Sequence, residues 1–362
     1  MVKNSYFYVK RSVLKFSYHK TNRFCRSWEG HSLFLINIWS ILLLCLMPSG
    51  LALASQPEPF HVRNMNPFTL LHGLPVATPS EILDDQQNSL SLQLDVANTS
   101  METVEESEQV TLDGETYRLA LTWQRGIGSG WQVGVEVPYL SHRGGGLDSL
   151  IENWHDLFGF SNSDRDDWSQ NQLRYLYIRD GVTEVNIQQE VSGIGDIHLQ
   201  LSREVVLADE EMKASMHMGL KLPTGDEDSL LGSGAPDLSI WFTGSDRKLI
   251  PGWPFGGYGH VGVLLMGKAE VLEEDQREFV MFGTLGINWR AYEWLDLKAQ
   301  VDAHTPFYHS KSDQLGGSAV MLTFGGTIPL EGGDHIDLSL GENLTTDMVP
   351  DLIFNIRYEA RF

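Results

Sequence analysis

The chain has 362 residues, of which 42% are hydrophobic and 20% are charged, and its formal net charge is −22. A mean hydropathy of −0.18 is too polar for a bundle of membrane helices. Such an excess of acidic residues argues against binding to nucleic acid, whose phosphates attract basic surfaces. We also find no sequence pattern of a phosphate-binding loop, a dinucleotide-binding fold, a zinc ribbon or a nucleophile elbow.

Residues 1–54 are predicted to be a secretory signal peptide with an extended basic region. Seven lysines and arginines precede the apolar run 33–47. That run is shorter than the roughly 20 residues that a membrane-spanning helix needs. A motif of small residues follows it and predicts cleavage between Ala54 and Ser55. An uncleaved N-terminal anchor is the alternative.

Hydrophobic and polar residues alternate along most of the chain after residue 88. Leu90 and Leu92 share one face of such a segment, for example, and Gln93 lies on the other. Period two is typical of β-strands because successive side chains point to opposite faces. The pattern predicts twelve strands, at 89–97, 115–125, 131–140, 192–206, 213–222, 234–243, 256–267, 278–290, 294–305, 317–328, 334–342 and 350–362.

The predicted connections alternate between long and short, as long extracellular loops and short periplasmic turns do in an outer-membrane barrel. The long ones are 98–114, 141–191 and 306–316, and the short ones are 126–130, 207–212 and 329–333. Aromatic residues cluster near strand ends, as at two membrane interfaces: Trp123, Trp131, Tyr139, Trp289 and Trp294. We therefore predict an all-β fold, an antiparallel transmembrane β-barrel of about twelve strands over residues 89–362.

The last strand ends on an aromatic residue. Tyr358 and Phe362 lie on its apolar face, which alternates with polar residues. This arrangement resembles the signal that the bacterial barrel-assembly machinery reads. We accordingly expect a protein of the Gram-negative cell outer membrane, with the assembly machinery, periplasmic chaperones, outer-membrane lipid and lipopolysaccharide as partners.

Two segments lie outside the predicted strands. Residues 55–88 are rich in proline and are predicted to lie in the periplasm or to plug the barrel. Residues 141–191 are predicted to be a long extracellular loop with a short amphipathic helix at 147–158 and a hairpin around Asp180-Gly181. This loop is expected to cover part of the pore, or alternatively to grip a lipid or another ligand.

The chain also carries several turn motifs, namely Asn66-Pro67-Phe68 with Gly73-Leu74-Pro75, Ser192 to Asp196, Gly219 to Asp226, and Leu231 to Gly234. Together they resemble a proteobacterial family known as domain of unknown function 3187, over roughly residues 60–362. The last two motifs also resemble outer-membrane barrels that are encoded beside aromatic-degradation pathways. The resemblance implies an outer-membrane barrel and supplies no reaction.

Candidate catalytic pairs are weak. A lipid-cleaving barrel would need a serine and a histidine together, and Ser141-His142, His309-Ser310 and His304 are the candidates. Neither pair has an acidic or amide partner that its spacing fixes. We therefore predict no catalytic residues and no enzyme, and we keep a lipid-modifying enzyme as an alternative. Because Cys25 and Cys45 both precede the cleavage site, no thiol chemistry is expected either.

A metal site is equally weak. Histidine and carboxylate side chains share the predicted inner face, namely His198, His217 and His304 with Asp196, Glu204, Asp296 and Asp302. Polar residues that pair with one another across a narrow lumen are the alternative that we favour, because buried charges need partners. The acidic run Asp226-Glu227-Asp228 lacks the spacing of a calcium loop. We predict no metal and no cofactor.

The predicted inner face supplies the candidate functional residues. These polar, lumen-facing candidates are Arg118, Glu136, Asp196, His198, His217, Lys221, Asp296, Lys298, Asp302, His304, Arg357, Glu359 and Arg361. Our first hypothesis is a porin-like channel or transporter for small molecules, and the resemblance adds that these can be hydrophobic. A structural or surface-interaction barrel without catalysis is the alternative.

Overall fold

The computed structural model describes residues 56–105, 107–146, 172–344, 348–350 and 352–362. All of them fall within one compact unit. Among these residues, no helix is long and apolar enough to cross a membrane. The predicted signal peptide and the predicted helix at 147–158 lie outside the described residues.

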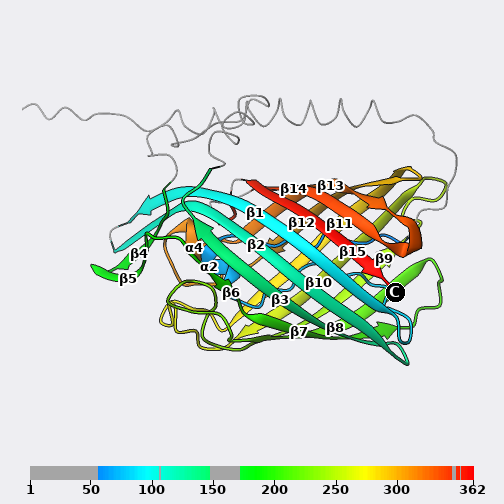
Figure 1. Cartoon of the computed structure of the whole chain (residues 1–362), viewed down its shortest axis with the longest axis horizontal. Helices are drawn as coiled ribbons and strands as arrows, with labels where there is room; N and C mark the ends of the chain where they lie inside the picture. Colours follow the sequence, from blue (N-terminus) through cyan, green and yellow to red (C-terminus); the bar gives the residue numbers. More distant parts are fainter. Residues whose placement is uncertain (1–55, 106, 147–171, 345–347, 351) are drawn as a thin grey trace, which may run out of the picture. The chain divides into compact units, whose positions relative to one another are not determined.

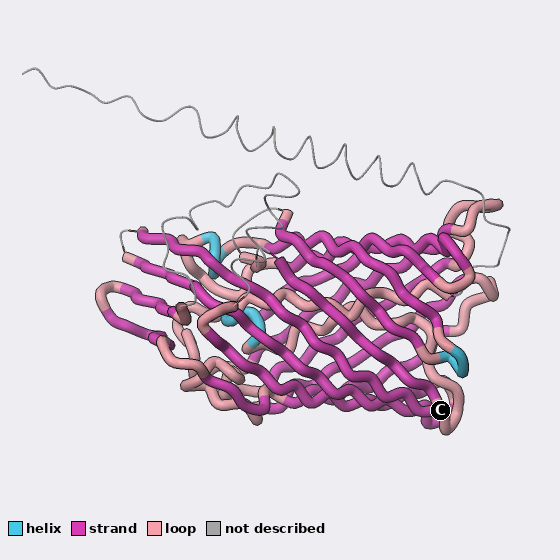
Figure 2. The backbone as a smooth tube through the Cα atoms, turned by 45° about the horizontal axis from the view of Figure 1, so that its top comes forward, coloured by secondary structure: helices cyan, strands magenta, loops and turns pink. Residues whose placement is uncertain are grey.

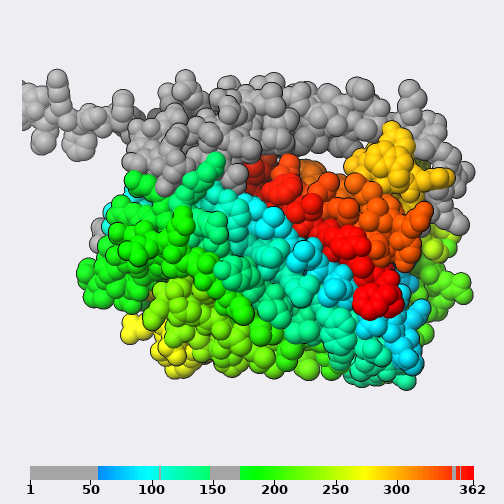
Figure 3. Space-filling view, viewed as in Figure 1, coloured from blue at the N-terminus to red at the C-terminus, as the bar shows by residue number. Residues whose placement is uncertain are grey.

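Twelve antiparallel strands close into a barrel, as predicted from the alternation (Figure 1). In chain order they are β1 (Asn88–Val104), β2 (Glu108–Gly128), β3 (Trp131–Arg143), β7 (Ile197–Val205), β8 (Met212–Leu222), β9 (Asp237–Asp246), β10 (Phe255–Met266), β11 (Phe279–Tyr292), β12 (Leu295–His304), β13 (Ala319–Pro329), β14 (His335–Asn343) and β15 (Leu352–Arg361). Each strand pairs with its neighbours in sequence, and β1 pairs with β15 to close the barrel. Figure 3 shows this seam, where the red C-terminal strand lies against the cyan N-terminal one.

Three further strands extend this sheet. β4 (Arg174–Arg179) and β5 (Val182–Ile187) form a hairpin, and β4 pairs with the first residues of β2. Asp180 and Gly181 form its turn with positive φ angles, as their sequence predicts. β6 (Val191–Ile194) pairs with the end of β3.

The two ends of the barrel differ in their connections. The connections 129–130, 206–211, 247–254, 293–294 and 330–334 lie at the end that holds Phe362, which we call the turn end (Figure 2). The connections 223–236, 267–278 and 305–318 lie at the other, the loop end, together with the hairpin of β4 and β5. A four-residue helix, α4 (Asp313–Gly316), lies in the loop 305–318, and a short 3₁₀ turn, η2 (Glu331–Gly333), joins β13 to β14.

One predicted loop is in fact strand. Residues 98–114 were expected to be a long connection because their polar, acidic composition hides the alternation. The structure continues β1 to Val104 and begins β2 at Glu108, so that only residues 105–107 connect them. The register from Asn98 paired with Glu115 to Val104 paired with Gln109 is unbroken. The hairpin therefore extends well beyond the alternating stretch on which the prediction rested.

The outer face of the strands is apolar and the inner face is polar. Outward side chains such as Leu285, Val261 and Met281 are 75%, 60% and 55% exposed. A water-soluble protein rarely exposes so much contiguous apolar surface, whereas lipid accommodates it. Exposed aromatic residues stand at the turn end, where Tyr292 and Trp294 stack with ring centroids 5.6 Å apart.

Residues 56–87, which we call the plug, pass through the barrel twice. The plug starts at the turn end, where Glu58 lies 2.8 Å from Arg361. It reaches the loop end at Asn64, whose amide donates to the carbonyl oxygen of Met348 over 3.1 Å. It then returns, because the Leu83 amide donates to Gln132 over 2.9 Å near the turn end. The plug thus forms a hairpin without strands inside the barrel.

The bend of the plug is a short helix, α2 (Pro67–Leu70), visible in blue in Figure 1. Asn66 caps it, since its side chain accepts from the Phe68 amide over 3.0 Å, and Pro67 occupies the first turn, where no amide hydrogen is needed. Phe68 packs edge-on against Tyr177 and Tyr308, with ring centroids 6.5 Å apart in both pairs. The apolar core therefore gathers around α2 at the loop end.

Candidate functional site

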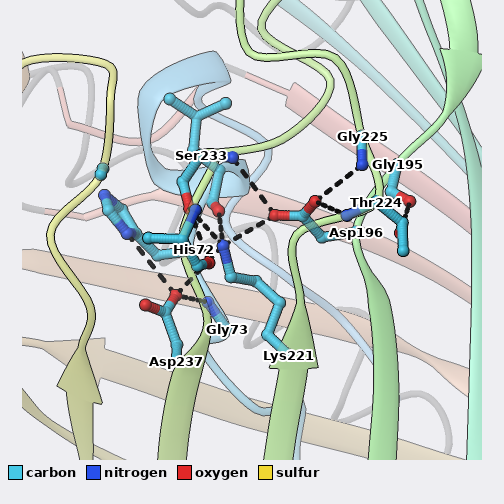
Figure 4. Close-up of polar contacts among 12 residues, drawn as sticks. His72, Gly73, Gly195, Asp196, Lys221, Thr224, Gly225, Ser233 and Asp237 are labelled. Atoms are coloured by element: carbon cyan, nitrogen blue, oxygen red, sulfur yellow. Dashed lines mark hydrogen bonds and ion pairs between the residues drawn. The ribbon is translucent and has the colours of Figure 1, made fainter.

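Lys221 of β8 is the centre of the contacts that hold the returning arm of the plug (Figure 4). Its fully buried ammonium group donates to Asp196 over 2.7 Å and to the backbone carbonyl of Leu71 over 2.8 Å. It also bonds Ser233 and lies 3.4 Å from Asp237. One buried cation thus links the wall, a loop and the plug. We call Lys221, Asp196, Asp237, Ser233 and His72 the latch.

Asp196 and Asp237 extend the latch in opposite directions. Asp196 accepts from the backbone amides of Thr224 and Gly225, each over 2.9 Å, and so fixes the start of the loop 223–236 (Figure 4). Asp237 accepts from the Gly73 amide of the plug over 2.8 Å. Gly73 permits this approach, because an added Cβ would lie only 3.0 Å from the Cβ of Lys221. Asp196 therefore holds the loop, Asp237 holds the plug, and Lys221 contacts both carboxylates.

His72 joins the latch to the apolar core. Its Nε2 lies 2.8 Å from the hydroxyl of Tyr308, and its Nδ1 lies 3.7 Å from Asp237. The imidazole also stacks on Phe307, with centroids 5.2 Å apart. Burial lowers the pKa of His72 below its ordinary value, which Asp237 opposes only in part. The neutral imidazole is therefore the form that fits this site at neutral pH.

A second group of contacts centres on Glu136 of β3. Its carboxylate binds Arg118 of β2 and lies 3.2 Å from Arg63 of the plug. Arg118 also lies 3.1 Å from Asp95 of β1. Arg63 donates in addition to the carbonyl oxygen of Leu74 over 2.8 Å, and thereby ties the two arms of the plug together. Burial, followed by the nearby Arg118, lowers the pKa of Arg63 to about 10, so it stays charged at neutral pH.

A third group lies on β14 and β15. Arg357 binds Glu359 and lies 3.5 Å from Asp337, which also lies 3.4 Å from Lys298. Arg361 bridges Glu359 at 2.8 Å to Glu58 of the plug. Opposite charges are therefore paired within the barrel, as burial of charge requires.

Gln300 and His304 of β12 hold the first arm of the plug. The Gln300 side chain accepts from the Phe60 amide over 2.9 Å and donates to the Phe60 carbonyl over 3.1 Å. His304 Nε2 lies 3.0 Å from the side-chain amide of Asn64. The Gln300 side chain thus makes the two hydrogen bonds to the Phe60 backbone that a neighbouring strand would otherwise make. The plug is therefore bound here without joining the sheet.

The remaining candidates from the sequence also point inward. Asp302 accepts from Gln300 over 2.9 Å, and Asp296 accepts from Arg290 over 2.9 Å. His217 lies 2.7 Å from the Ser202 hydroxyl and stacks on Trp241. His198 lines a cavity that is described below. Four further inward residues, which are buried, were absent from the candidates predicted from the sequence: Asp95, Asp237, Asp337 and Gln300.

Small cavities lie on both sides of the plug. The Arg63 cavity, of about 60 Å³, lies between the plug and strands β2, β3 and β7–β9. The Arg361 cavity, of about 100 Å³, lies at the turn end and shares Thr78 and Gln124 with it. On the other side of the plug lies a cavity of about 30 Å³ near Asp302 and His304. The lumen is thus largely filled, and most of the remaining space lies on one side.

The candidate catalytic pairs do not form sites. His142 points inward to Thr116 at 2.9 Å, whereas Ser141 accepts from Arg143 on the outer face. Ser310 binds Glu108, while the His309 backbone amide donates to the Asp275 carbonyl oxygen and its side chain is exposed. Within the described ranges, no group of three or more histidine, cysteine or acidic residues is arranged to hold a metal ion.

The C-terminal residues close the barrel. Phe362 exchanges two backbone hydrogen bonds with Asn88, of 2.7 and 3.0 Å, and its ring is 68% exposed on the outer face. The Tyr358 hydroxyl donates to Asp334 in the neighbouring turn over 2.6 Å. The aromatic residues that were proposed as an assembly signal therefore lie at the seam between β1 and β15.

A family model described as "Protein of unknown function (DUF3187)" matches residues 35–362. No curated protein matches the sequence. Among solved structures, the COG4313 outer membrane channel from Pseudomonas putida F1 is similar, with a TM-score of 0.52 and 10% identity over 78% of this chain and 98% of that one. The NanC porin aligns with a TM-score of 0.41 and 7% identity over 75% of this chain and 97% of that one. The toluene transporter TodX from Pseudomonas putida aligns with a TM-score of 0.34 and 11% identity over 86% and 95%. At such identities the first similarity establishes a common barrel fold.

Proposed function

The chain belongs to the DUF3187 family, and we propose that it is an outer-membrane channel for small molecules whose pore is closed by its own N-terminal segment. The apolar outer face and polar inner face support a barrel in lipid. With that location we propose the partners expected from the sequence, which are lipid, lipopolysaccharide, the barrel-assembly machinery and periplasmic chaperones.

The way in which the plug is bound carries this proposal. Within the described residues, backbone-to-backbone bonds between plug and wall occur only at Gln86 and Gln87, beside β1. The other contacts use side chains such as Lys221, Gln300 and Arg361. A segment held in this way can leave the lumen without breaking the hydrogen bonds of the barrel wall. A barrel with a purely structural role would not need a removable filling.

The lumen favours polar over hydrophobic solutes. The family resemblance adds hydrophobic molecules to the expected substrates. However, the barrel interior is lined by ion pairs such as those of Glu136, Lys298 and Arg357, and a hydrophobic solute would have to pass them. We therefore propose small solutes that carry polar groups.

Single-channel conductance in a planar bilayer tests the proposal. The protein would be purified from the outer membranes of cells that express the full chain, next to a variant that lacks residues 58–83. We expect rare openings from the intact protein and steady conductance from the variant. A variant that lacks the hairpin 174–187 is the matched control, and it should conduct like the intact protein. Silence in all three, with folding confirmed by heat-dependent gel mobility, would refute a channel.

A surface-interaction barrel remains the second candidate. The hairpin of β4 and β5 continues the sheet from β2 and leaves β5 as an edge strand, which can pair with a strand of another protein. Loss of binding to whole cells or to envelope proteins in the hairpin variant, with unchanged conductance, would favour this function.

A further inference from the structure

A groove lies on the outer face of the barrel near the turn end. It has a volume of about 640 Å³, which falls within the roughly 300–1,000 Å³ of pockets that hold small molecules. Outward side chains such as Leu285 and Val301 line it. Leu249, from the connection between β9 and β10, folds over this face as well, since a Cβ added at Gly257 would lie 2.9 Å from its Cδ2. The groove is therefore largely apolar and opens toward lipid.

Small residues form the floor of the groove. Ala214 of β8 pairs with Gly244 of β9, which in turn pairs with Gly259 of β10, and all three occupy outward positions. Three neighbouring strands thus lack a large side chain at the same level. At outward positions of β1 and β2, by contrast, the paired residues are Leu92 and Leu121. The groove is therefore a local feature of the wall around β8–β12.

The barrel itself does not require a glycine at position 244. A Cβ added there would meet only the carbonyl oxygen of Lys213, at 3.8 Å, which is an ordinary contact. Glycine inside a strand costs stability, and it commonly marks a bulge, a bend or the close approach of another molecule. The register of β9 with both neighbouring strands is unbroken at Gly244. The close approach of an occupant is the remaining explanation for this residue.

The depth of the groove in the membrane indicates what fills it. Trp253, Phe255 and Trp289 form a row of rings at the turn end, with centroids 6.2 and 6.0 Å apart, and aromatic rings of this kind mark the membrane interface. Gly259 lies further along β10 than Phe255. With a rise of about 3.3 Å per residue and a tilt of about 45°, it lies roughly 10 Å deeper, within the roughly 15 Å of one leaflet's hydrocarbon. The floor of the groove is therefore at the level of acyl chains.

Charged residues lie at the turn-end edge of the groove. Arg247 and Lys248, in the same connection as Leu249, both pair with Glu211, and their side chains are 33% and 51% exposed. The two cations together carry more N–H donors than this one carboxylate accepts. Asp246, which also lines the groove, accepts from the Lys248 backbone amide over 2.7 Å. A phosphate group suits the remaining donors, because it is anionic and accepts several hydrogen bonds.

From these observations we propose that the groove binds one phospholipid, with an acyl chain over Gly244 and Gly259 and the phosphate beside Arg247 and Lys248. The floor of the groove lies at the depth of lipid tails, and its edge offers cations at the depth of headgroups. The site is on the outside of the wall, so the proposal does not depend on conduction. It adds one specifically held lipid to the general lipid environment that the proposed function expects.

Photo-crosslinking tests the position of the acyl chain. The full chain, purified from outer membranes, would be reconstituted into vesicles of phosphatidylethanolamine that contain a trace of the same lipid with a diazirine in the middle of one acyl chain. After irradiation, mass spectrometry of peptides locates the label. We expect it to concentrate on Gly244, Gly259 and Leu285 and to be weaker at Leu92 and Leu121. Equal labelling around the barrel would overturn a specific site.

Filling the groove should abolish this preference. Gly244→Leu should lower labelling of the groove about tenfold, which corresponds to about 1.4 kcal/mol and to roughly two displaced methylene groups. Ala303→Leu is the matched control, because Ala303 is an exposed outward residue of β12 that does not line the groove. Ala214→Leu replaces Gly244→Leu if the latter does not fold. Unchanged labelling in a folded groove variant would contradict the proposed acyl-chain site.

Retention of lipid in detergent tests the phosphate contact. Native mass spectrometry should find one phospholipid on the intact protein and none when Arg247→Gln is combined with Lys248→Gln. Lys268→Gln should keep the lipid, since Lys268 is an 88% exposed residue at the loop end that pairs with Glu273 over 3.4 Å. Equal retention by these variants would remove the phosphate contact from the proposal. A lipid-free dimer of the intact protein that Gly244→Leu abolishes would assign the groove to a second copy and refute the lipid site.

Discussion

The ammonium group of Lys221, in the wall of the barrel, donates a hydrogen bond of 2.8 Å to the backbone carbonyl of Leu71, in the plug. No substitution of Leu71 can remove this acceptor, because it belongs to the backbone. The contact therefore depends on the wall residue alone, and the wall side of the latch is where it can be tested.

Lys221→Met should loosen the plug. The change leaves Asp196 and Asp237 buried without their shared cation, and breaking a buried pair in this way costs about 3–5 kcal/mol. We expect more frequent openings in bilayer recordings and a lower temperature of heat-dependent gel mobility. Lys213→Met is the matched control, because Lys213 lies on the same strand, is partly exposed and forms only a 3.9 Å pair with Glu81. Identical behaviour of both variants would contradict the latch.

Gly73→Ala tests the close approach of plug and wall. An added Cβ would lie 3.0 Å and 3.1 Å from the Cβ atoms of Lys221 and Asp237, which cannot yield without backbone movement. We expect openings to become more frequent and stability to fall by about 1–3 kcal/mol. Gly146→Ala is the control, since nothing lies within 4 Å of its added Cβ. If both variants keep the intact protein's conductance, the approach at Gly73 does not govern closure.

Glu136→Gln should change ion selectivity. The substitution removes the negative charge that Arg63 and Arg118 share beside the Arg63 cavity. The remaining positive charges should move the reversal potential in a salt gradient toward that of an anion-selective pore. Asp296→Asn, away from this cavity and next to Arg290, should leave the reversal potential nearly unchanged. An equal shift in both variants would indicate a general charge effect that does not depend on the position of Glu136.

Acid should weaken the latch through His72. Because the folded-state pKa of His72 lies below the ordinary value of about 6.5, its contribution to stability is complete above that pH. It is lost as the pH falls from about 6.5 toward the lowered pKa, by at most about 1.4 kcal/mol per pH unit. The groups that face His72 are Asp237, Lys221, Asp196 and Tyr308.

The measurement is open probability between pH 7.5 and 4.5. The intact protein should open more as the pH falls, and His72→Gln should show a flatter dependence. His309→Gln, at an exposed loop position, is the control and should retain the full dependence. A pH profile that is unchanged in His72→Gln would assign the acid response to other groups.

Phe362→Ser should reduce the yield of assembled barrel in the membrane. The backbone of Phe362 pairs with Asn88 at the seam, so the serine variant keeps these bonds and loses only the aromatic side chain. Phe279→Ser at the loop end, where the ring is 53% exposed, is the matched control. A larger loss in the terminal variant, measured as folded protein in outer membranes, would support the assembly signal. Equal yields would show that Phe362 contributes no more to assembly than another lipid-facing aromatic residue does.

The sequence predicts the strands well because alternation is a local property. Leu90 and Leu92 face lipid while Gln93 faces inward, and any strand in a barrel must repeat that pattern. Residues 98–104 are an exception, because they are part of β1 although they were predicted to be a loop. They belong to the end of the β1–β2 hairpin beyond the alternating stretch, where the acidic run Glu102 to Glu108 resembled a loop.

The alternation along a strand predicts which side chains point into the barrel, but it does not predict which residues they contact. The position of Lys221 in its strand predicts an inward side chain, but nothing local indicates that it meets the backbone of Leu71, 150 residues away. Likewise, the prolines of residues 55–88 predict a segment without strands, and leave its route undetermined. Asp237 lies within the predicted strand 234–243, but its contacts with Lys221 and with Gly73 of the plug join residues far apart in the sequence.

The plug is continuous with β1, and this linkage has a kinetic consequence. A plug that leaves the lumen remains attached at Gln87, within reach of its binding groups. Its return is then an intramolecular step, at an effective concentration on the order of millimolar for a short tether. Reclosure should therefore be fast and independent of protein concentration. A free peptide with the sequence of residues 56–87 would have to approach millimolar concentration before it silenced a barrel from which that segment had been deleted.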